Sequence, residues 1–349
     1  MRRTTKLAAV LSTAVLALSA CGGGDSESDS GGDSGGGDAG SDIKVGVAYD
    51  VGGRGDQSFN DSAAAGLDQA SDELGLDFQE SEASDGESEA DREERLRTFA
   101  EAGYTHIIGV GFAYSPSIAA VAPEYPEVSF AIIDDEAAVG DNIANLVFAE
   151  EQGSFLVGAA AALKSESGQI GFVGGVETPL IQKFQAGYEA GAEAVNEDIQ
   201  VDVTYLTQPP DFSGFADPAR GETAATGMYD DGADVVYHAA GGSGGGVFEA
   251  ASQADALAIG VDSDQYETAD PAVQDVILTS MLKNVNVAVY EWLTAAAEGD
   301  TPTGTTRYDL AADGVGYSTS GGQVDDIEDQ LEDFKQQIVD GEIEVPTTP

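Results

Sequence analysis

Short apolar runs alternate with segments in which apolar residues recur at helical spacing over residues 43–339. The first run, 43–49, predicts a strand, and the periodic segment after it, 58–74, predicts a helix. Ser58 or Asn60 would cap the start of that helix. The same alternation predicts further strands at 106–110, 128–133, 143–148, 169–173, 200–206, 234–238, 256–261 and 276–281. It predicts further helices at 87–102, 152–163, 179–195, 218–230, 246–253, 284–297 and 327–339.

Strands that alternate with helices are typical of parallel sheets covered by helices on both faces. The series restarts at about residue 169, and a body of roughly three hundred residues exceeds the usual size of one domain. We therefore predict two Rossmann-like lobes, an N-terminal lobe over 42–148 and a C-terminal lobe over 149–279.

The first twenty residues differ from this body. A basic head (Arg2, Arg3 and Lys6) precedes an apolar stretch at 7–18, which predicts a signal peptide over 1–20. The apolar stretch is shorter than the ~20 residues that span a bilayer. Cys21, the only cysteine, follows Leu-Ser-Ala in an order that resembles a bacterial lipobox. We expect cleavage before Cys21 and a lipid on its thiol; the alternative is an ordinary cleaved signal with an incidental cysteine.

Residues 22–40 consist almost wholly of Gly, Ser, Asp and Glu. Such a segment buries too little apolar surface to offset the entropy lost on ordering. Residues 21–41 are therefore predicted to be a lipidated cysteine and a flexible linker with a reach of roughly 25 Å. This arrangement places the protein on the extracytoplasmic face of the cell membrane, held there by its lipid.

The charge balance excludes several partners. The formal net charge is −50, and removal of residues 1–20 takes away three basic residues and no acid, which makes it −53. Nucleic acids and anionic membrane surfaces need basic patches, so neither is expected to bind. No stretch matches the EF-hand spacing, and no metal or cofactor is predicted. The dispersed acids indicate solvated faces, as in a protein adapted to high salt.

Candidate ligand-binding residues follow the predicted strands, since ligands of open α/β sheets bind beyond the carboxyl ends of the strands. Carboxylates, glycines, an aromatic residue and one lysine occur at these positions. Such a set suits a small polar ligand with hydroxyl groups and a flat ring. The residues concerned are Asp50, Phe59, Asn60, Asp134, Gly241, Gly242, Asp262 and Lys283.

An alternative hypothesis, that the protein is an enzyme, depends on Ser243. This serine lies in a G-x-S-x-G pattern between a predicted strand and a predicted helix, which is where the nucleophile of one class of hydrolases occurs. That class of hydrolase needs a histidine after the serine in the chain. The two histidines, His106 and His238, both precede Ser243. Binding is therefore favoured over catalysis.

Six motifs, in order, resemble the Bmp (basic membrane protein) family over about residues 43–341. They are Asp-Gln-Ser-Phe-Asn at 56–60, Phe-Gln-Ala-Gly-Tyr-Glu-Ala-Gly at 184–191, Phe-Ala-Asp-Pro at 215–218, Val-Phe-Glu-Ala-Ala at 247–251, Gly-Val-Asp-Ser-Asp-Gln at 260–265 and Thr-Ser-Met-Leu-Lys at 279–283. The family consists of lipoproteins that serve as substrate-binding components of ABC importers and includes a purine nucleoside receptor.

The resemblance implies a type I periplasmic-binding-protein fold with two lobes, three crossovers and a ligand cleft between the lobes. About 280–305 would return to the N-terminal lobe, and 306–349 partly to the C-terminal lobe. The mechanism we favour is capture of a nucleoside by lobe closure, followed by its delivery to a permease. A tethered receptor of this kind can work as a monomer. A same-fold receptor for a sugar or signalling molecule, and a secreted hydrolase using Ser243, remain as alternatives.

Residue roles also follow from the resemblance. Phe59 and Phe215 would sandwich the base, with Phe212 as a competitor for the second role. Asp262 would accept hydrogen bonds from the ribose hydroxyls, and Lys283 would donate to the same sugar. The remaining expected contributors are Gly241 and Gly242 through their backbones, Asp134 at the base, Asn60 and Asp50 from the first loop, and Phe184 as a wall. The alternatives are core packing for the phenylalanines and capping for Asn60 and Asp50.

This chain departs from the expected pattern between Leu206 and Phe215. The segment 207–214 is longer than the short Gly-Ser step expected in the family, and it lies beside a predicted stacking residue. The preference for one base over another therefore stays open.

Overall fold

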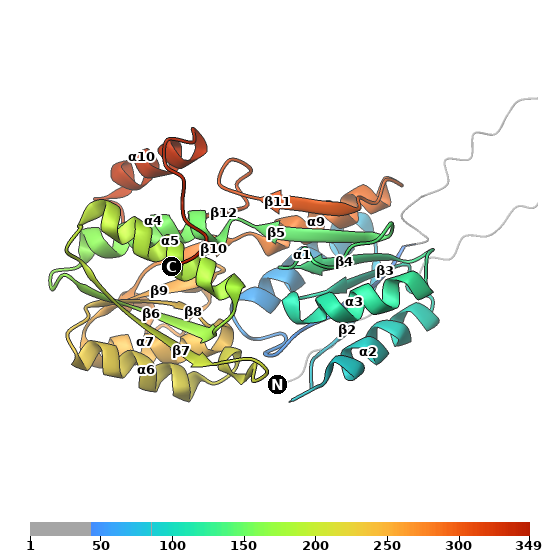
Figure 1. Cartoon of the computed structure of the whole chain (residues 1–349), viewed down its shortest axis with the longest axis horizontal. Helices are drawn as coiled ribbons and strands as arrows, with labels where there is room; N and C mark the ends of the chain where they lie inside the picture. Colours follow the sequence, from blue (N-terminus) through green and yellow to red (C-terminus); the bar gives the residue numbers. More distant parts are fainter. Residues whose placement is uncertain (1–42, 85) are drawn as a thin grey trace, which may run out of the picture. The chain divides into compact units, whose positions relative to one another are not determined.

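The computed structural model describes residues 43–84 and 86–349 (Figure 1). The predicted signal peptide, Cys21 and the linker lie outside the described residues. No helix in the described part is both long and apolar enough to cross a membrane.

The first lobe is built on a six-stranded parallel sheet with the order β11-β5-β4-β3-β1-β2. Its strands are β1 (Lys44–Ala48), β2 (Asp77–Ser81), β3 (His106–Gly109), β4 (Ser129–Ile133), β5 (Ile143–Phe148) and β11 (Gly304–Tyr308). Its helices are α1 (Phe59–Leu74), α2 (Glu89–Glu101), α3 (Ser115–Val121) and α9 (Val285–Ala297). Helices α1 and α9 pack closely because Gly66 has no side chain: a Cβ there would lie 2.3 Å from the carbonyl oxygen of Asn286.

The second lobe has a six-stranded sheet with the order β12-β10-β9-β8-β6-β7, in which only β12 is antiparallel to its neighbour. Its strands are β6 (Gln169–Val176), β7 (Gln200–Thr207), β8 (Val235–Ala239), β9 (Leu257–Asp262), β10 (Ile277–Lys283) and β12 (Val315–Tyr317). Its helices are α4 (Glu150–Lys164), α5 (Pro179–Val195), α6 (Pro218–Asp230), α7 (Gly244–Ala254), α8 (Gln265–Thr268) and α10 (Glu328–Val339). Short 3₁₀ turns occur at Phe112–Tyr114, Ala122–Glu124, Ser213–Phe215, Gly241–Ser243 and Gln274–Val276.

The chain passes between the two sheets three times, after β5, after β10 and after β11. Two parallel sheets with three crossovers confirm the predicted fold class. The return to the first lobe differs from the expected 280–305. Strand β10 stays in the second sheet to Lys283, and β11 stays in the first sheet to Tyr308. The cores are apolar strands under helices, as in Val45, Val47 and Ile108 of the first lobe, all at most 2 % exposed.

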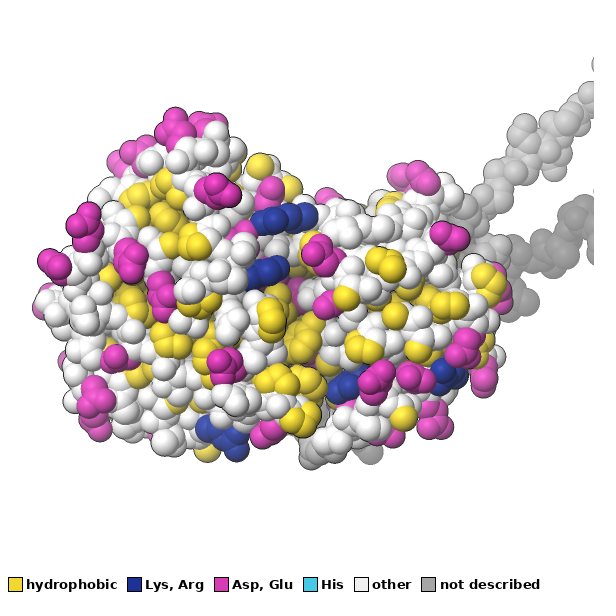
Figure 2. All heavy atoms as spheres, viewed as in Figure 1, with side chains coloured by type: hydrophobic (Ala, Val, Ile, Leu, Met, Phe, Trp, Pro, Cys, Tyr) yellow, Lys and Arg dark blue, Asp and Glu magenta, His cyan; other side chains and the backbone are white. Residues whose placement is uncertain are grey.

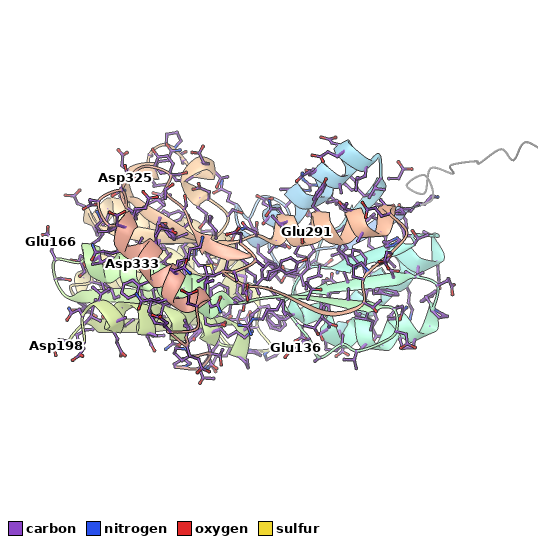
Figure 3. The ribbon with its side chains drawn as sticks, turned by 90° about the horizontal axis from the view of Figure 1, so that it is seen from above. Glu136, Glu166, Asp198, Glu291, Asp325 and Asp333 are labelled. Carbon is purple, nitrogen blue, oxygen red and sulfur yellow. The ribbon has the colours of Figure 1, made fainter. Side chains whose placement is uncertain are left out.

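The acidic residues lie on the surface. Figure 2 shows Asp and Glu side chains scattered over the visible face of both lobes, with few Lys and Arg between them. The labelled acids in Figure 3 extend away from the ribbon, and all are exposed: Glu136, Glu166, Asp198, Glu291, Asp325 and Asp333. Exposed carboxylates keep their hydration, so they add charge without a desolvation cost.

Candidate functional site

A cavity lies between the loops that follow the strands of the two sheets. Nine of the ten sequence-predicted ligand-binding residues line this cavity; Gly242 is the exception. Much of the lining is buried: Asn60 and Lys283 are each 1 % exposed, and Phe184 is 2 % exposed.

Lys283, the last residue of β10, is the centre of a buried charge cluster. Its Nζ forms an ion pair with Asp134, which follows β4 in the other lobe, and lies 3.6 Å from Oε1 of Glu150. Burial disfavours the charged ammonium, but Asp134, Glu150 and Asp262 together raise the pKa of Lys283 above its usual value. Sequence reasoning missed Glu150, the first residue of α4, because nothing in its local sequence separates it from the many surface acids.

Burial raises the pKa of Asp134 to about 7, although the positive charge of Lys283 opposes the shift. One Asp134 oxygen, Oδ1, is buried and has no hydrogen-bond partner among the described residues. The carboxyl group is thus only partly satisfied by the protein, and it faces the cavity. Its unpaired oxygen is available to accept a hydrogen bond from a ligand.

The raised pKa of Asp134 predicts a pH dependence of stability. The folded-state value, about 7, lies above the ordinary value of 3.8, so the folded protein holds the proton more tightly than the unfolded chain. The stabilisation is fully present below about pH 4 and is lost as the pH rises towards 7. The comparison is between the wild type and Asp134→Asn, which has no titrating group at this position. We expect the free energy of unfolding of the wild type to fall relative to that of the variant, by about 1 kcal/mol for each pH unit between pH 4 and pH 7. Urea unfolding between pH 4 and 8 measures this difference; a difference independent of pH would contradict it.

Aromatic rings form the walls of the cavity. Phe59, the first residue of α1, and Phe184 of α5 lie near the Lys283 ammonium, with ring centres 4.9 and 5.5 Å from Nζ. These distances suit cation–π contacts. Phe112 and Phe215 line the cavity as well, with ring centres 6.5 Å apart. Phe112 was not predicted from the sequence, since it lies in a short turn after β3 with no distinctive motif.

Phe215 is held in place by a glycine of the second lobe. A Cβ at Gly175 would lie 2.4 Å from the Phe215 ring, so only glycine lets the ring pack against the end of β6. Phe215 and Phe59 are both half-buried rather than fully enclosed in a core. Each ring therefore keeps a surface towards the cavity.

The loop before α1 is organised by Asp56. Its carboxylate accepts the backbone N–H groups of Ser58, Asn60 and Asp61 at 2.9–3.1 Å and the Asn60 side-chain amide at 3.0 Å. Ser58 occupies the N-cap position, as expected, but its side chain makes no bond to the helix, and Asp56 accepts the free N–H groups instead. The Ser58 hydroxyl group donates to Asp262 and so is not available as a cap.

Asn60 instead connects residues at the cavity wall. Its Nδ2 donates to Oδ1 of Asp50 at 3.1 Å, and its own Oδ1 is buried without a partner among the described residues. Burial raises the pKa of Asp50 well above its usual value, and the hydrogen bond from Asn60 opposes this shift. A carboxyl group and an amide side by side offer both acceptors and donors to a ligand.

Asp262 ends β9 and joins the two lobes. Its carboxylate accepts a short hydrogen bond from Ser58 Oγ of the first lobe and is 7 % exposed. Two neighbouring bonds cross the same boundary: Ser263 Oγ donates to the Ser58 carbonyl at 3.1 Å, and Gln265 Nε2 donates to the Gln57 carbonyl at 3.0 Å. Burial raises the pKa of Asp262, and the Lys283 charge and the Ser58 bond oppose this shift.

The glycine-rich turn after β8 has no catalytic arrangement. Gly241 lines the cavity at a φ of +54°, a conformation that favours glycine. Ser243 Oγ donates to the Gly214 carbonyl at 2.7 Å and accepts the Asp217 N–H at 2.7 Å, so its hydroxyl group anchors the neighbouring loop. Burial lowers the pKa of His238 to about 4, and its ring packs against Phe248. These groups therefore have structural roles.

Two Rossmann-like lobes with a cavity between them, lined by aromatic rings and buried charged groups, are the arrangement of two-lobed solute-binding proteins. Residues 43–349 match the family model of Bmp, the ABC transporter substrate-binding protein PnrA-like family, and the chain belongs to this family. It is an extracytoplasmic, non-enzymatic binding protein whose partners are a solute and a membrane permease.

Relatives and solved structures agree with this assignment. The chain is 37% identical to the "CD4+ T-cell-stimulating antigen" of Listeria monocytogenes, over 98% of both chains. It is 32% identical to the "ABC transporter nucleoside-binding protein BmpA" of Lactococcus lactis subsp. cremoris, over 99% of both chains. A solute-binding protein of an ABC transporter system from Aeropyrum pernix K1 superposes with a TM-score of 0.76 at 32% identity, over 87% of this chain and 93% of that one. The myo-inositol-binding protein of Caulobacter shares the fold alone, with a TM-score of 0.60 at 14% identity, over 81% of this chain and 95% of that one.

Proposed function

We propose that this protein binds a nucleoside, with a purine base, by closure of its two lobes and delivers it to the permease. The observation that carries the proposal is the make-up of the cavity: phenylalanine rings line it together with a buried carboxylate and lysine. A nucleoside has the matching parts, a flat base and a sugar with adjacent hydroxyl groups. The printed name of the Lactococcus relative supports the same ligand class.

At the sugar, Asp262 accepts hydrogen bonds from the ribose hydroxyls. An ionised carboxylate is acceptor-only, so a diol is a suitable partner for it. Lys283 donates to the same sugar, and Gly241 and Gly242 offer backbone groups. The excess of carboxylates over ammonium groups around Lys283 favours a ligand that carries donors and no phosphate.

At the base, Phe59 and Phe215 stack on the ring from opposite lobes. Such stacking contributes ~0.5–1.5 kcal/mol beyond burial. Asn60, Asp50 and Asp134 supply polar contacts at its edge, where Asn60 Oδ1 and Asp134 Oδ1 lack protein partners among the described residues. Phe184 walls the cavity beside Lys283.

The N-terminal segment extends the proposal to the location of the protein in the cell. A signal peptide over 1–20, a lipid on Cys21 and a flexible linker to residue 41 would hold a monomeric binding protein at the outer face of the membrane, beside its permease. A reach of roughly 25 Å lets the folded body turn and dock while it stays anchored.

Calorimetric titration of the chain lacking residues 1–21 tests the ligand. Before titration the protein is unfolded and refolded to remove any bound solute. We expect tight binding of inosine and adenosine, with ribose and the free bases each at least about tenfold weaker, because the cavity contacts both parts of the ligand. Equal binding of ribose alone, or no binding across purine and pyrimidine nucleosides, would overturn the nucleoside assignment in favour of another polar ligand.

A further inference from the structure

The loop after β7 reaches from the second lobe to the first. Phe212 in this loop lies edge-on to Phe112, with ring centres 5.7 Å apart and planes at 81°. The guanidinium carbon of Arg92 lies 5.9 Å from the centre of the same ring. Phe112 follows β3 and Arg92 lies in α2, so both belong to the first lobe. We call this set of three residues the Phe212 contact.

The second lobe holds the base of the Phe212 loop firmly. Thr207 Oγ1 donates to the Asp211 carbonyl at 2.6 Å, and Ser213 N–H donates to Oδ1 of Asp211 at 3.0 Å. Behind Phe212, Gly214 approaches the end of β6 so closely that a Cβ would lie 2.0 Å from the Gly175 carbonyl oxygen. The loop is therefore ordered by its own lobe, and little entropy remains to be lost when Phe212 meets the first lobe.

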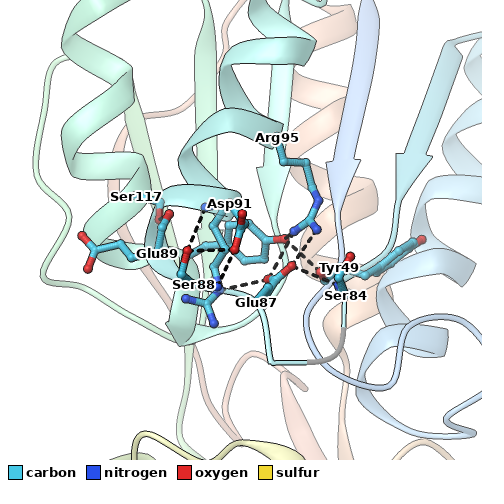
Figure 4. Close-up of polar contacts among 10 residues, drawn as sticks. Tyr49, Ser84, Glu87, Ser88, Glu89, Asp91, Arg95 and Ser117 are labelled. Atoms are coloured by element: carbon cyan, nitrogen blue, oxygen red, sulfur yellow. Dashed lines mark hydrogen bonds and ion pairs between the residues drawn. The ribbon is translucent and has the colours of Figure 1, made fainter.

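The first lobe presents Arg92 in a fixed position. Arg92 Nε lies 3.1 Å from Oε1 of Glu87, whose side chain is 2 % exposed, and the second Glu87 oxygen pairs with Arg95 at 2.6 Å. Arg95 donates in turn to the Tyr114 hydroxyl group, which donates to the Tyr49 carbonyl at 2.9 Å. Figure 4 shows the network around Glu87. The buried Glu87 carboxylate therefore places the Arg92 guanidinium group by charge attraction, since Arg92 Nε makes no hydrogen bond among the described residues.

Phe212 is absent from the lining of the ligand cavity, whereas Phe112 and Phe215 belong to it. Phe212 thus joins the lobes from outside the cavity, through Phe112, whose ring lines the cavity, and through Arg92, which does not. The Ser58–Asp262 bond differs in that the second-lobe residue that forms it lines the cavity itself. Removal of the Phe212 ring therefore removes no side chain from the cavity lining.

We propose that the Phe212 contact stabilises the closed form and thereby sets how slowly the bound solute is released. The inference rests on the lobe closure of the proposed function and not on the identity of the ligand. A contact made only in the closed form shifts the open–closed equilibrium by its own interaction free energy. The solute enters the open form, where the contact does not exist, so the rate of association is unaffected and the rate of release carries the effect.

The test compares Phe212→Ala with wild type by stopped-flow measurement of inosine binding and release. An aromatic pair of this kind supports an increase of about tenfold in the release rate, with an unchanged association rate. Phe212→Tyr keeps the ring and is expected to release at the wild-type rate. Phe334→Ala is the matched control, because Phe334 makes a similar edge-on contact with Phe155 within the second lobe, at 5.5 Å between ring centres. It is expected to leave release unchanged.

A second measurement does not depend on nucleoside binding. Without residues 1–21 the chain contains no cysteine, so spin labels attach only at cysteines introduced at exposed Asp77 of the first lobe and exposed Asp198 of the second. Without added ligand, Phe212→Ala is expected to increase the fraction of long distances between the labels. If no nucleoside binds, this measurement alone decides the inference. An unchanged distance distribution, or slower association in place of faster release, would overturn it.

Discussion

Replacing Asp262 by asparagine is expected to raise the dissociation constant for inosine about 10- to 150-fold. The estimate is the scale of a hydrogen bond to a charged group, about 1.5–3 kcal/mol. Asparagine keeps the size of the side chain and tolerates the backbone of this position, where φ is +64°. It removes the carboxylate that, in the proposed mode of binding, accepts hydrogen bonds from the ribose hydroxyls.

The same substitution is expected to leave the free energy of unfolding within about 1 kcal/mol of wild type, because it also removes a buried charge whose desolvation opposes folding. Calorimetric titration and urea unfolding measure the two quantities on the same samples. Asp255→Asn is the matched control, since Asp255 is an exposed aspartate at a φ of +53° after α7. If the affinity for inosine falls equally in Asp255→Asn and Asp262→Asn, or falls in neither variant, Asp262 does not bind the ligand.

Replacing Lys283 by methionine is expected to lower the free energy of unfolding by about 3–5 kcal/mol at pH 8, the usual cost of removing one partner of a buried ion pair. The substitution leaves Asp134 buried without a cation and leaves Glu150 with only the more exposed Lys183. The loss is expected to shrink at pH 5, because the Asp134 pKa, about 7 even beside Lys283, lies above that pH and a protonated carboxyl group needs no counter-charge. Methionine matches the length of the lysine stem, so the packing against Phe59 is retained.

Lys183→Met provides the comparison for this prediction. Lys183 pairs with the same Glu150, at 3.4 Å, but its side chain is 34% exposed. An ion pair that open to solvent is worth roughly 1 kcal/mol or less. Equal losses for the two lysines, or a Lys283→Met loss that does not change between pH 8 and pH 5, would show that the charge cluster is not organised around Lys283.

The local pattern of apolar and polar residues was sufficient to predict the helices and strands that form the core. The helix expected at 58–74 is found at Phe59–Leu74, and the helix expected at 179–195 is found at Pro179–Val195. Both segments bury one face, and burial imposes the apolar period from which they were predicted. Strands β2 and β11 were missed because they lie at the edges of the first sheet, where most of their side chains face solvent and no apolar run is needed.

The candidate site was predictable where it follows strand ends and where a family motif marks it, as at Phe184 and Phe215. Carboxyl ends of parallel strands meet at one edge of a sheet, so the position of Asp262 or Lys283 in the order of elements indicates a place in the cleft. Glu150 and Phe112 also follow strand ends, those of β5 and β3, but no local motif separates them from the other acids and phenylalanines of the chain, so they were missed.

The sequence by itself determined the two-lobe α/β class, the approximate ends of the core strands and the family, because these depend on local periodicity and on short motifs. Only the tertiary structure decided the pairing of Lys283 with Asp134, 149 positions away, and of Phe212 with Arg92. The packing of the lobes determines such pairs. It brings together side chains that lie far apart in the sequence, and the local sequence around one residue does not indicate its partner. Burial then raises the pKa of Asp134, an effect that depends on solvent exclusion and so exists only in the folded chain.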